Sequence, residues 1–363
     1  MRALATRALA TRGKLRHPIL AMPRPTFLPQ SADRARLPVA LLAGFLGSGK
    51  TTLVNALLRD PRLAHTAVAV NEFGEIPLDR DLIDHGEDRT VVLANGCLCC
   101  NLAGDMEDAV MRLFSRRDAG AVPRFRRLII EPSGLSDPAP IAQAILRNPV
   151  MARGLRLVAV ITTVDAQFAL PQIEQHPETR KQIALADQVL ITKTDVAPAD
   201  PARQAVIRLN PAAAIREAPF GRIDAACLFP ADFFDPAAPA TQRSVLFADQ
   251  AEDTAGHLSR YASVTLTADH ALDWRAFEAW LRRIRLTHAD SLLRLKGILH
   301  IDGAAGPVVI HGIHHVLNAP VQLDAWPGAD HRSRLVLIAD HATIQVARES
   351  WAAALPGLLA PGA

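Results

Sequence analysis

Cysteine, net charge and long apolar runs are all scarce in this chain. Only four of its 363 residues are cysteines. Four cysteines in so long a chain do not form a disulfide framework, and they favour a reducing compartment, for which we expect the cytoplasm. No apolar run reaches the length of a membrane span, so we expect no membrane association.

The charge balance also excludes a class of partner. The chain has 40 Lys and Arg against 37 Asp and Glu, a formal net charge of +3, and the arginines are scattered among acids. A nucleic-acid binder concentrates its basic residues, so we expect no nucleic-acid partner. The length predicts two domains, and a hydrophobic content of 49% is ample for their cores.

Residues 1–36 have an unusual composition. They repeat the pentad Ala-Leu-Ala-Thr-Arg at 3–7 and 8–12, and contain several prolines and no acid before Asp33. An Arg-rich, acid-poor start is also found in organelle transit peptides, but a secretory signal would need a long apolar centre and a cleavage site. We interpret this segment as a disordered extension, or as the result of a start codon assigned too early.

The segment 44–51 organises the first half of the chain. It reads Gly-Phe-Leu-Gly-Ser-Gly-Lys-Thr and lies between an apolar strand pattern and a helical pattern, the setting of a phosphate-binding loop. Its glycines let main-chain N–H groups face a phosphate at the start of the helix, and Lys50 adds a positive charge. The Thr51 hydroxyl is placed to ligate Mg²⁺. The residues expected to bind the nucleotide phosphates are Gly44, Gly47, Ser48, Gly49, Lys50, Thr51 and Thr52.

Apolar strands alternate with amphipathic helices through residues 37–219. This alternation predicts an α/β fold, a P-loop NTPase domain with a mostly parallel sheet covered by helices on both faces. The candidate strands are 39–43, 66–70, 90–93, 128–130, 157–164 and 188–191.

A linker and a second domain follow. Residues 220–256 show neither the helical nor the strand periodicity of apolar residues. We interpret them as a linker whose aromatic residues attach it to the first domain. From 257 to 363 we expect a smaller α+β domain with an antiparallel sheet, and a helix capped by Asp273. Its other expected elements are strands at 261–267, 292–301, 307–316 and 334–338, and a last helix at 343–354.

Two further motifs match a nucleotide site. Glu131 ends an apolar strand and is followed by Gly134, a pattern that places a carboxylate at the magnesium shell and an N–H at the γ-phosphate. Downstream, 192–195 reads Thr-Lys-Thr-Asp. The carboxylate of Asp195 can accept two hydrogen bonds from guanine, which adenine cannot supply, while the stem of Lys193 covers the base. The alternative is a polar loop that happens to end in aspartate.

Three of the four cysteines crowd into four positions. Cys97 and Cys99 are two residues apart and can share a face of an extended segment, and a turn can add Cys100. Three thiolates suit zinc or copper(I) and leave a position open for exchange. The alternative is three buried structural thiols, which is our interpretation of the isolated Cys227.

A charged segment at 71–79 follows the second predicted strand. Its place is that of a switch segment, which reorders when the γ-phosphate leaves. Glu72 and Glu75 can join the metal or magnesium shell, or they can simply be solvated.

Taken together, these motifs resemble the CobW-type family of metal-handling P-loop GTPases. The resemblance rests on segments 44–51, 71–75, 96–100, 131–138 and 192–195, and in the second half on 293–299, His311-Gly312 and Trp326. It implies a GTP-hydrolysing metallochaperone that delivers Zn(II), Co(II) or a similar ion to a client metalloenzyme.

The same resemblance implies a role for each site residue. Lys50 and Thr51 would handle phosphate and Mg²⁺, Glu131 the magnesium and water shell, and Asp195 the guanine base. The cargo metal would be held by Cys97, Cys99 and Cys100. Glu75 is a further candidate ligand of the transition metal because of its place in the charged segment, and the resemblance does not assign it.

The chain departs from the family pattern in two places. Thr192 stands where the family usually has Asn, which bonds the base and braces the phosphate loop, so part of the guanine affinity is in doubt. The histidine-rich run of many members is missing, and His311, His314 and His315 are too few to replace it, which argues against metal storage.

Several alternatives stay open at this point. No arginine finger is identifiable, so we expect slow intrinsic hydrolysis, accelerated by metal or a client. A regulatory scaffold that binds GTP and metal without turnover is one alternative. Another is an accessory GTPase dedicated to one enzyme, such as a nitrile hydratase or a cobalamin-pathway chelatase. The protein can be a monomer or a homodimer.

Overall fold

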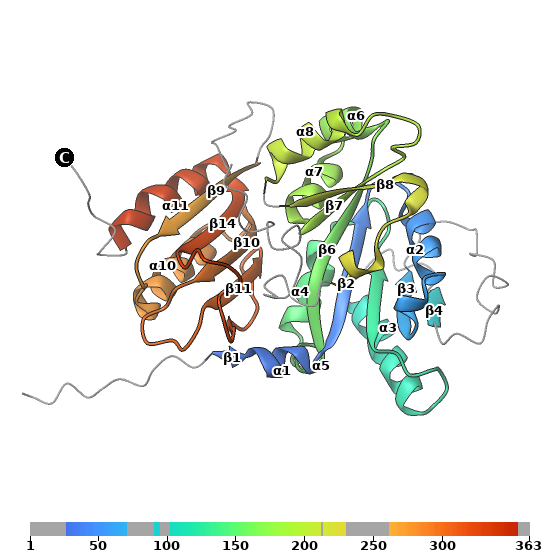
Figure 1. Cartoon of the computed structure of the whole chain (residues 1–363), viewed down its shortest axis with the longest axis horizontal. Coiled ribbons are helices and arrows are strands. Elements are labelled where there is room, and N and C mark those ends of the chain that lie inside the picture. Colours follow the sequence, from blue (N-terminus) through green and yellow to red (C-terminus); the bar gives the residue numbers. More distant parts are fainter. Residues whose placement is uncertain (1–26, 71–90, 95–101, 212, 230–260, 355–363) are drawn as a thin grey trace, which may run out of the picture.

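The structure is a computed structural model that describes residues 27–70, 91–94, 102–211, 213–229 and 261–354. Figure 1 shows two domains side by side, each built on its own sheet. In the described residues no helix is long and apolar enough to cross a membrane.

The first domain is built on a parallel sheet of seven strands in the order β4-β3-β5-β2-β6-β7-β8, and all the pairs in it are parallel. This confirms the expected α/β fold. The strands are β2 (Leu37–Gly44), β3 (Thr66–Val70), β4 (Val91–Ala94), β5 (Arg127–Glu131), β6 (Leu155–Asp165), β7 (Gln188–Thr192) and β8 (Ala214–Ala218). The sequence analysis did not predict β8, a half-buried strand at the sheet edge.

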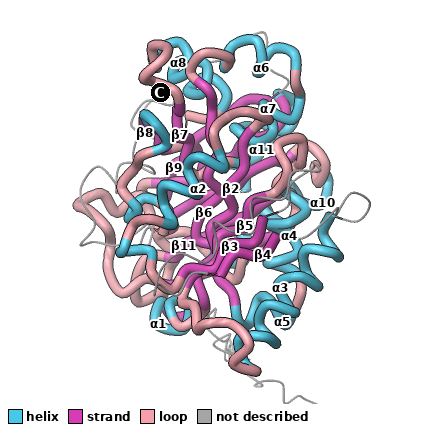
Figure 2. Tube along the Cα trace, turned by 90° about the vertical axis from the view of Figure 1, so that its right-hand side faces the viewer, coloured by secondary structure: helices cyan, strands magenta, loops and turns pink. Residues whose placement is uncertain are grey.

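Helices cover both faces of this sheet, as Figure 2 shows. On one face, three helices pack against buried side chains of β2 and β5, through Leu113 of α3, Ile141 of α4 and Leu185 of α7. On the other face, Leu53 and Leu57 of α2 pack against Leu42. The helices are α2 (Lys50–Leu58), α3 (Leu102–Asp118), α4 (Ala139–Arg147), α5 (Pro149–Gly154), α6 (Ala169–Gln175), α7 (Pro177–Leu185) and α8 (Asp200–Leu209).

The second domain packs two helices on a mixed sheet. Its strand order is β1-β13-β11-β10-β14-β9, with β12 paired to β11. The elements are β9 (Tyr261–Ala268), α10 (Trp274–Thr287), β10 (Leu292–Leu299), β11 (Val308–Ile313), β12 (Val316–Leu317), β13 (Val321–Gln322), β14 (Ser333–Asp340) and α11 (His341–Ala354). As predicted, Asp273 caps α10, its carboxylate accepting from Ala276 N at 2.8 Å.

The start of the described chain differs from the expectation of a disordered extension over residues 1–36. Residues 27–36 contain β1 (Leu28–Pro29) and α1 (Gln30–Arg34), and β1 pairs in parallel with β13, which makes the second sheet mixed rather than antiparallel. The segment also reaches the first domain, because Arg36 Nη1 donates to Ala152 O at 3.1 Å. These contacts are long-range, so local sequence patterns do not predict them. Residues 1–26 lie outside the described residues.

Part of the predicted linker belongs to the first domain. The turns η3 (Pro219–Gly221) and η4 (Ala225–Cys227) follow β8, and Phe229 packs on the core beneath α2. Cys227 is a buried free thiol whose pKa is raised by burial, which fits its interpretation as a structural residue. Residues 230–256 lie outside the described residues.

Candidate nucleotide site

The phosphate-binding loop runs from the end of β2 into α2, and its glycines are required by its conformation. Gly47 and Gly49 have φ of 71° and 90°, in the left-handed region that favours glycine. A Cβ on Gly44 would lie 2.1 Å from Thr163 Oγ1, so no larger residue fits between β2 and β6. Gly49 is the N-cap of α2, which places the positive end of the helix dipole at the loop.

Lys50 lies across this loop. Its Nζ donates to Gly44 O at 2.9 Å and to Phe45 O at 3.2 Å, and the residue is only 9% exposed. The ammonium is therefore held where the loop curls around it, in the position from which a phosphate can be bound.

Ser48 holds the loop against the sheet. Its side chain is fully buried, and Oγ lies 2.7 Å from Thr163 Oγ1 on β6. The hydroxyl therefore faces the sheet, and the loop is fastened to β6 behind the phosphate position.

The loop after β5 approaches the phosphate loop closely. Glu131, which ends β5, is 4% exposed. A Cβ on Gly134 would lie 2.7 Å from Leu46 N, so the two loops touch at a point where only glycine fits. Gln182 of α7 holds this loop from behind, with Nε2 donating to Gly134 O at 3.0 Å.

These two loops enclose one pocket of about 420 Å³. It gathers most of the residues predicted from the sequence, including the three assigned to catalysis, Lys50, Thr51 and Glu131. Its lining is Leu46, Gly47, Gly49, Lys50, Thr51, Thr52, Glu131, Pro132, Ser133, Gly134 and Lys193. The remaining loop residues, Gly44 and Ser48, lie behind this wall.

The end of β7 completes the site on one side. Lys193 lines the pocket, and its Nζ donates to Asp165 Oδ2 at 2.6 Å. Asp195 is exposed just beyond it and does not line the pocket. Its Oδ1 accepts from the main-chain N of Phe220 at 3.2 Å.

The sequence patterns did not identify the residues that contact Lys193 and Asp195 at the end of β7. Asp165 ends a strand next to β7, and its place after an apolar run was the available signal. Phe220 and Gly221 both have positive φ, and a Cβ on Gly221 would lie 3.1 Å from the Thr52 side chain. The Pro-Phe-Gly turn was a local signal, but its contact with α2 was not readable from sequence.

The predicted cargo ligands Cys97, Cys99, Cys100 and Glu75 lie outside the described residues. Within the described part of the chain, no group of three or more His, Cys, Asp or Glu side chains could hold a metal ion. His311, His314 and His315 are thus not part of such a group there.

Comparisons with known proteins agree with this geometry. Residues 38–219 match the family model described as the CobW/HypB/UreG nucleotide-binding domain, and residues 261–355 match the cobalamin synthesis protein CobW C-terminal domain. The zinc chaperone YjiA of Escherichia coli K12 is 33% identical over 324 residues, covering 88% of this chain and 98% of the relative.

A further relative and a solved structure are also similar to this chain. The zinc-regulated GTPase metalloprotein activator 1 of Schizosaccharomyces pombe is 29% identical over 198 residues, covering 52% of this chain and 47% of the relative. The crystal structure of the Zn(II)-bound YjiA GTPase from E. coli superimposes with a TM-score of 0.65 at 28% identity, covering 88% of this chain and 98% of that chain. The chain therefore belongs to the CobW family of metal-handling P-loop GTPases.

Proposed function

We propose that this protein hydrolyses GTP and uses the nucleotide state to control transfer of a transition metal, zinc or cobalt, to a client metalloenzyme. The observation that carries the proposal is the pocket in which Lys50, Thr51 and Glu131 meet. A basic and a hydroxyl group at the start of a helix, with a carboxylate at the end of a neighbouring strand, are the parts that phosphoryl transfer needs.

The phosphate chain of the nucleotide would lie along the loop at the start of α2. Lys50 now donates to two loop carbonyls, and a bound triphosphate would exchange these acceptors for charged phosphate oxygens. The ammonium is already in place, so binding needs little rearrangement of the loop. Lys50 and the start of α2 would stabilise the negative charge on the phosphates. We expect this to be the main contribution to the rate of GTP hydrolysis.

The oxygen groups of the pocket fit a magnesium ion. Thr51 and Glu131 both line it, and Mg²⁺ prefers oxygen ligands together with substrate phosphates. These two residues would hold the ion, which when bound neutralises charge that develops on the phosphates.

Asp195 and Lys193 support guanine as the base. Lys193 is held by Asp165 beside the pocket, with its stem available to cover one face of the base. The exposed Asp195 carboxylate would accept from guanine, and the Phe220 N–H that it now accepts from would be released toward the base.

The metal part of the proposal rests on chemistry and on relatives. Thiolates at Cys97, Cys99 and Cys100 suit zinc or cobalt, and relatives of this chain are named zinc chaperones. In sequence, the cysteines lie between the phosphate loop and Glu131. Metal binding and nucleotide binding can therefore both bias the conformation of the segment that joins these two parts of the site.

The test compares purified metal-free protein with two variants. Lys50→Met should abolish GTP hydrolysis, while Cys97→Ser, Cys99→Ser and Cys100→Ser together should remove the metal-thiolate absorption and leave GTP binding intact. Cys227→Ser is the matched control, because that thiol is buried in the core. Hydrolysis unchanged in Lys50→Met would contradict the proposal.

Zinc content alone is too weak a readout. A variant of the E. coli relative with one glutamate and two cysteines replaced by alanine is also Zn(II)-bound in its crystal structure. The charge-transfer band of the thiolates is therefore measured together with stoichiometry.

A further inference from the structure

The segment formed by α7 and β7 contacts both sides of the candidate nucleotide site. Near the end of α7, the side chain of Gln182 is 1% exposed, and its Nε2 donates to Gly134 O at 3.0 Å and to Ser136 O at 3.1 Å. At the end of β7, Thr192 Oγ1 donates to Ser48 O at 2.7 Å. One continuous segment therefore fastens both loops of the pocket.

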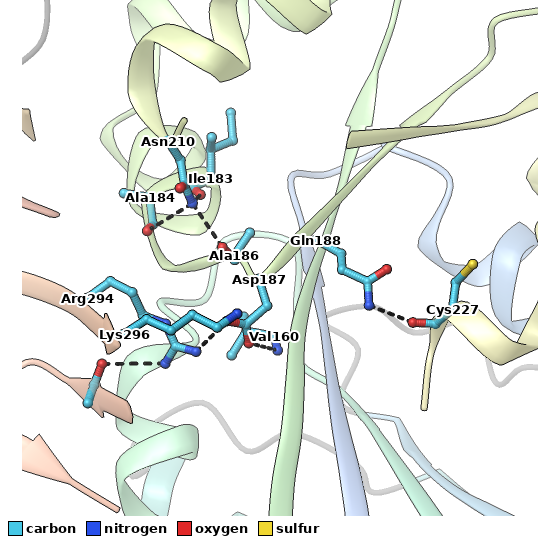
Figure 3. A network of polar contacts seen from close by, with 11 residues as sticks. Val160, Ile183, Ala184, Ala186, Asp187, Gln188, Asn210, Cys227, Arg294 and Lys296 are labelled. Atoms are coloured by element: carbon cyan, nitrogen blue, oxygen red, sulfur yellow. Dashed lines mark hydrogen bonds and ion pairs between the residues drawn. The ribbon is translucent and has the colours of Figure 1, made fainter. Parts of the chain in front are cut away.

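The same segment is held by the second domain at its midpoint. Asp187, between α7 and β7, is 3% exposed, and its Oδ1 accepts from Arg294 Nη2 and, at 3.2 Å, from Lys296 Nζ. Both cations belong to β10 of the second domain, and Figure 3 shows them reaching the carboxylate. The other oxygen of Asp187 accepts from Val160 N at 2.9 Å, which ties the junction to β6.

The end of α7 is held by further polar contacts. Asn210 Nδ2 donates to Ile183 O at 2.8 Å and to Ala186 O at 2.9 Å, so the last helical carbonyls have partners, as Figure 3 shows. Lys181, one residue before Gln182, is paired with Asp137 at 3.2 Å. Between Lys181 and Asp187 the chain has little freedom to move independently of the groups it contacts.

We propose that Gln182 is a positioning residue for the loop from Glu131 to Ser136, and that the second domain acts on the nucleotide site through it by holding Asp187. The inference rests on the proposed function, because it assigns to that loop the γ-phosphate of GTP. Gln182 itself does not line the pocket.

Gln182 fixes the conformation of the loop at two peptide groups. Its Nε2 holds the carbonyls of Gly134 and Ser136, and in a trans peptide a held C=O also fixes the direction of the N–H that follows it, here those of Leu135 and Asp137. Gly134 also abuts the phosphate loop at Leu46. A loop fixed in this way is organised for the γ-phosphate in advance, which favours GTP over GDP, whose phosphates end before this loop.

The first experiment measures dissociation constants for GDP and for a non-hydrolysable GTP analogue. Gln182→Met keeps the length of the side chain and removes the donor. We expect the analogue to bind on the order of tenfold more weakly and GDP less than twofold more weakly, because two hydrogen bonds that act only on the γ-phosphate loop are lost. Gln175→Met, at an exposed glutamine of α6, is the control.

The second experiment tests the link to the second domain. Lys296→Met leaves Arg294 on Asp187 and should lower the GTP-analogue preference severalfold. Combined with Gln182→Met, it should add nothing further, since both act through one segment. Arg283→Met, at an exposed cation of α10, is the matched control.

Two results would overturn the inference. Equal weakening of both nucleotides by Gln182→Met would mean a merely structural role, and multiplicative effects of the two substitutions would break the link to the second domain. Wild-type protein that binds with the expected preference but never turns GTP over would contradict the proposed function alone.

Discussion

Thr192 Oγ1 donates a hydrogen bond to the main-chain carbonyl of Ser48 at 2.7 Å. The strand that ends in the predicted base-reading motif is thereby tied to the glycine-rich loop at the start of α2. The family usually has Asn at this position, which both bonds the base and braces the loop. Thr192 keeps the brace with a shorter side chain. The bond to the base that Asn would supply has no equivalent in Thr192, whose hydroxyl is also directed to Val164 O at 3.2 Å.

Removing this brace should weaken every nucleotide alike. Thr192→Val keeps the shape of the side chain and leaves Ser48 O without its donor, a loss of about 1–2 kcal/mol that corresponds to about five- to thirtyfold in affinity. GTP and GDP should be affected equally, since the loop contacts phosphates that both share. Thr66→Val, a buried threonine of β3 remote from the loop, is the control. Equal affinities in Thr192→Val and wild type would contradict the account.

Asp195 should determine base specificity. In Asp195→Asn the amide can no longer accept both guanine donors, and we expect GTP binding to fall by more than tenfold while xanthosine triphosphate gains. Asp200→Asn, at an exposed aspartate of α8, should leave the preference unchanged. Competition binding with GTP, XTP and ATP measures the effect, and an unaltered preference for GTP in Asp195→Asn would exclude this residue as the base reader.

Gly134 should tolerate no side chain. A Cβ there would lie 2.7 Å from the main-chain N of Leu46, a separation that real contacts do not show, so the two loops must move apart in Gly134→Ala. We expect the rate of GTP hydrolysis to fall at least tenfold, because the geometry at the γ-phosphate is lost. Gly154→Ala is the matched control, since nothing lies within 4 Å of a Cβ at that glycine. Full activity in Gly134→Ala would show that the loop does not act in hydrolysis.

Acid should destabilise the junction between the domains through His311. Burial, with the positive charges of Lys296 and Arg294 nearby, lowers the pKa of His311 to about 3 from the ordinary value of 6.5, against the opposing effect of Asp187. As the pH falls below 6.5 the unfolded chain binds a proton on this ring and the folded protein does not, so stability decreases down to about pH 3.

The measurement is urea unfolding at pH 6.5 and pH 5. The contribution of His311 over this interval is about 2 kcal/mol, and His311→Gln should remove it from the difference between the two pH values. An identical pH dependence in His311→Gln and wild type would contradict this, because it would mean that the ring binds a proton as readily in the folded protein as in the unfolded chain.

Local sequence signals pointed to the residues that line the candidate nucleotide site. The glycines and the strand-loop-helix order indicated Lys50 and Thr51, the end of an apolar strand indicated Glu131, and the structure brings these three residues together in one pocket. The strands of the first domain followed from near-continuous apolar runs, since both faces of that sheet are covered. The edge strand β8 was missed because Arg216 and Glu217 interrupt its apolar residues.

Long-range contacts account for what the sequence did not predict. The pairing of β1 with β13 joins residues nearly three hundred positions apart in sequence, as Leu28 opposite Val321 shows. Gln182 and Asp187 read as ordinary helix-end polar residues, and only the folded chain places them against Gly134 and Arg294. The metal assignment to Cys97, Cys99, Cys100 and Glu75 stays a prediction.

The most direct test of the central claim is a titration of metal-free protein with Zn(II) and then Co(II), with and without GTP, following turnover and thiolate-to-metal absorption together. The account predicts stoichiometric binding to the cysteines, an affinity that changes with GTP, and a change in turnover on metal binding. Turnover indifferent to metal, with no thiolate band, would leave a GTPase whose crowded cysteines are structural and would contradict the account.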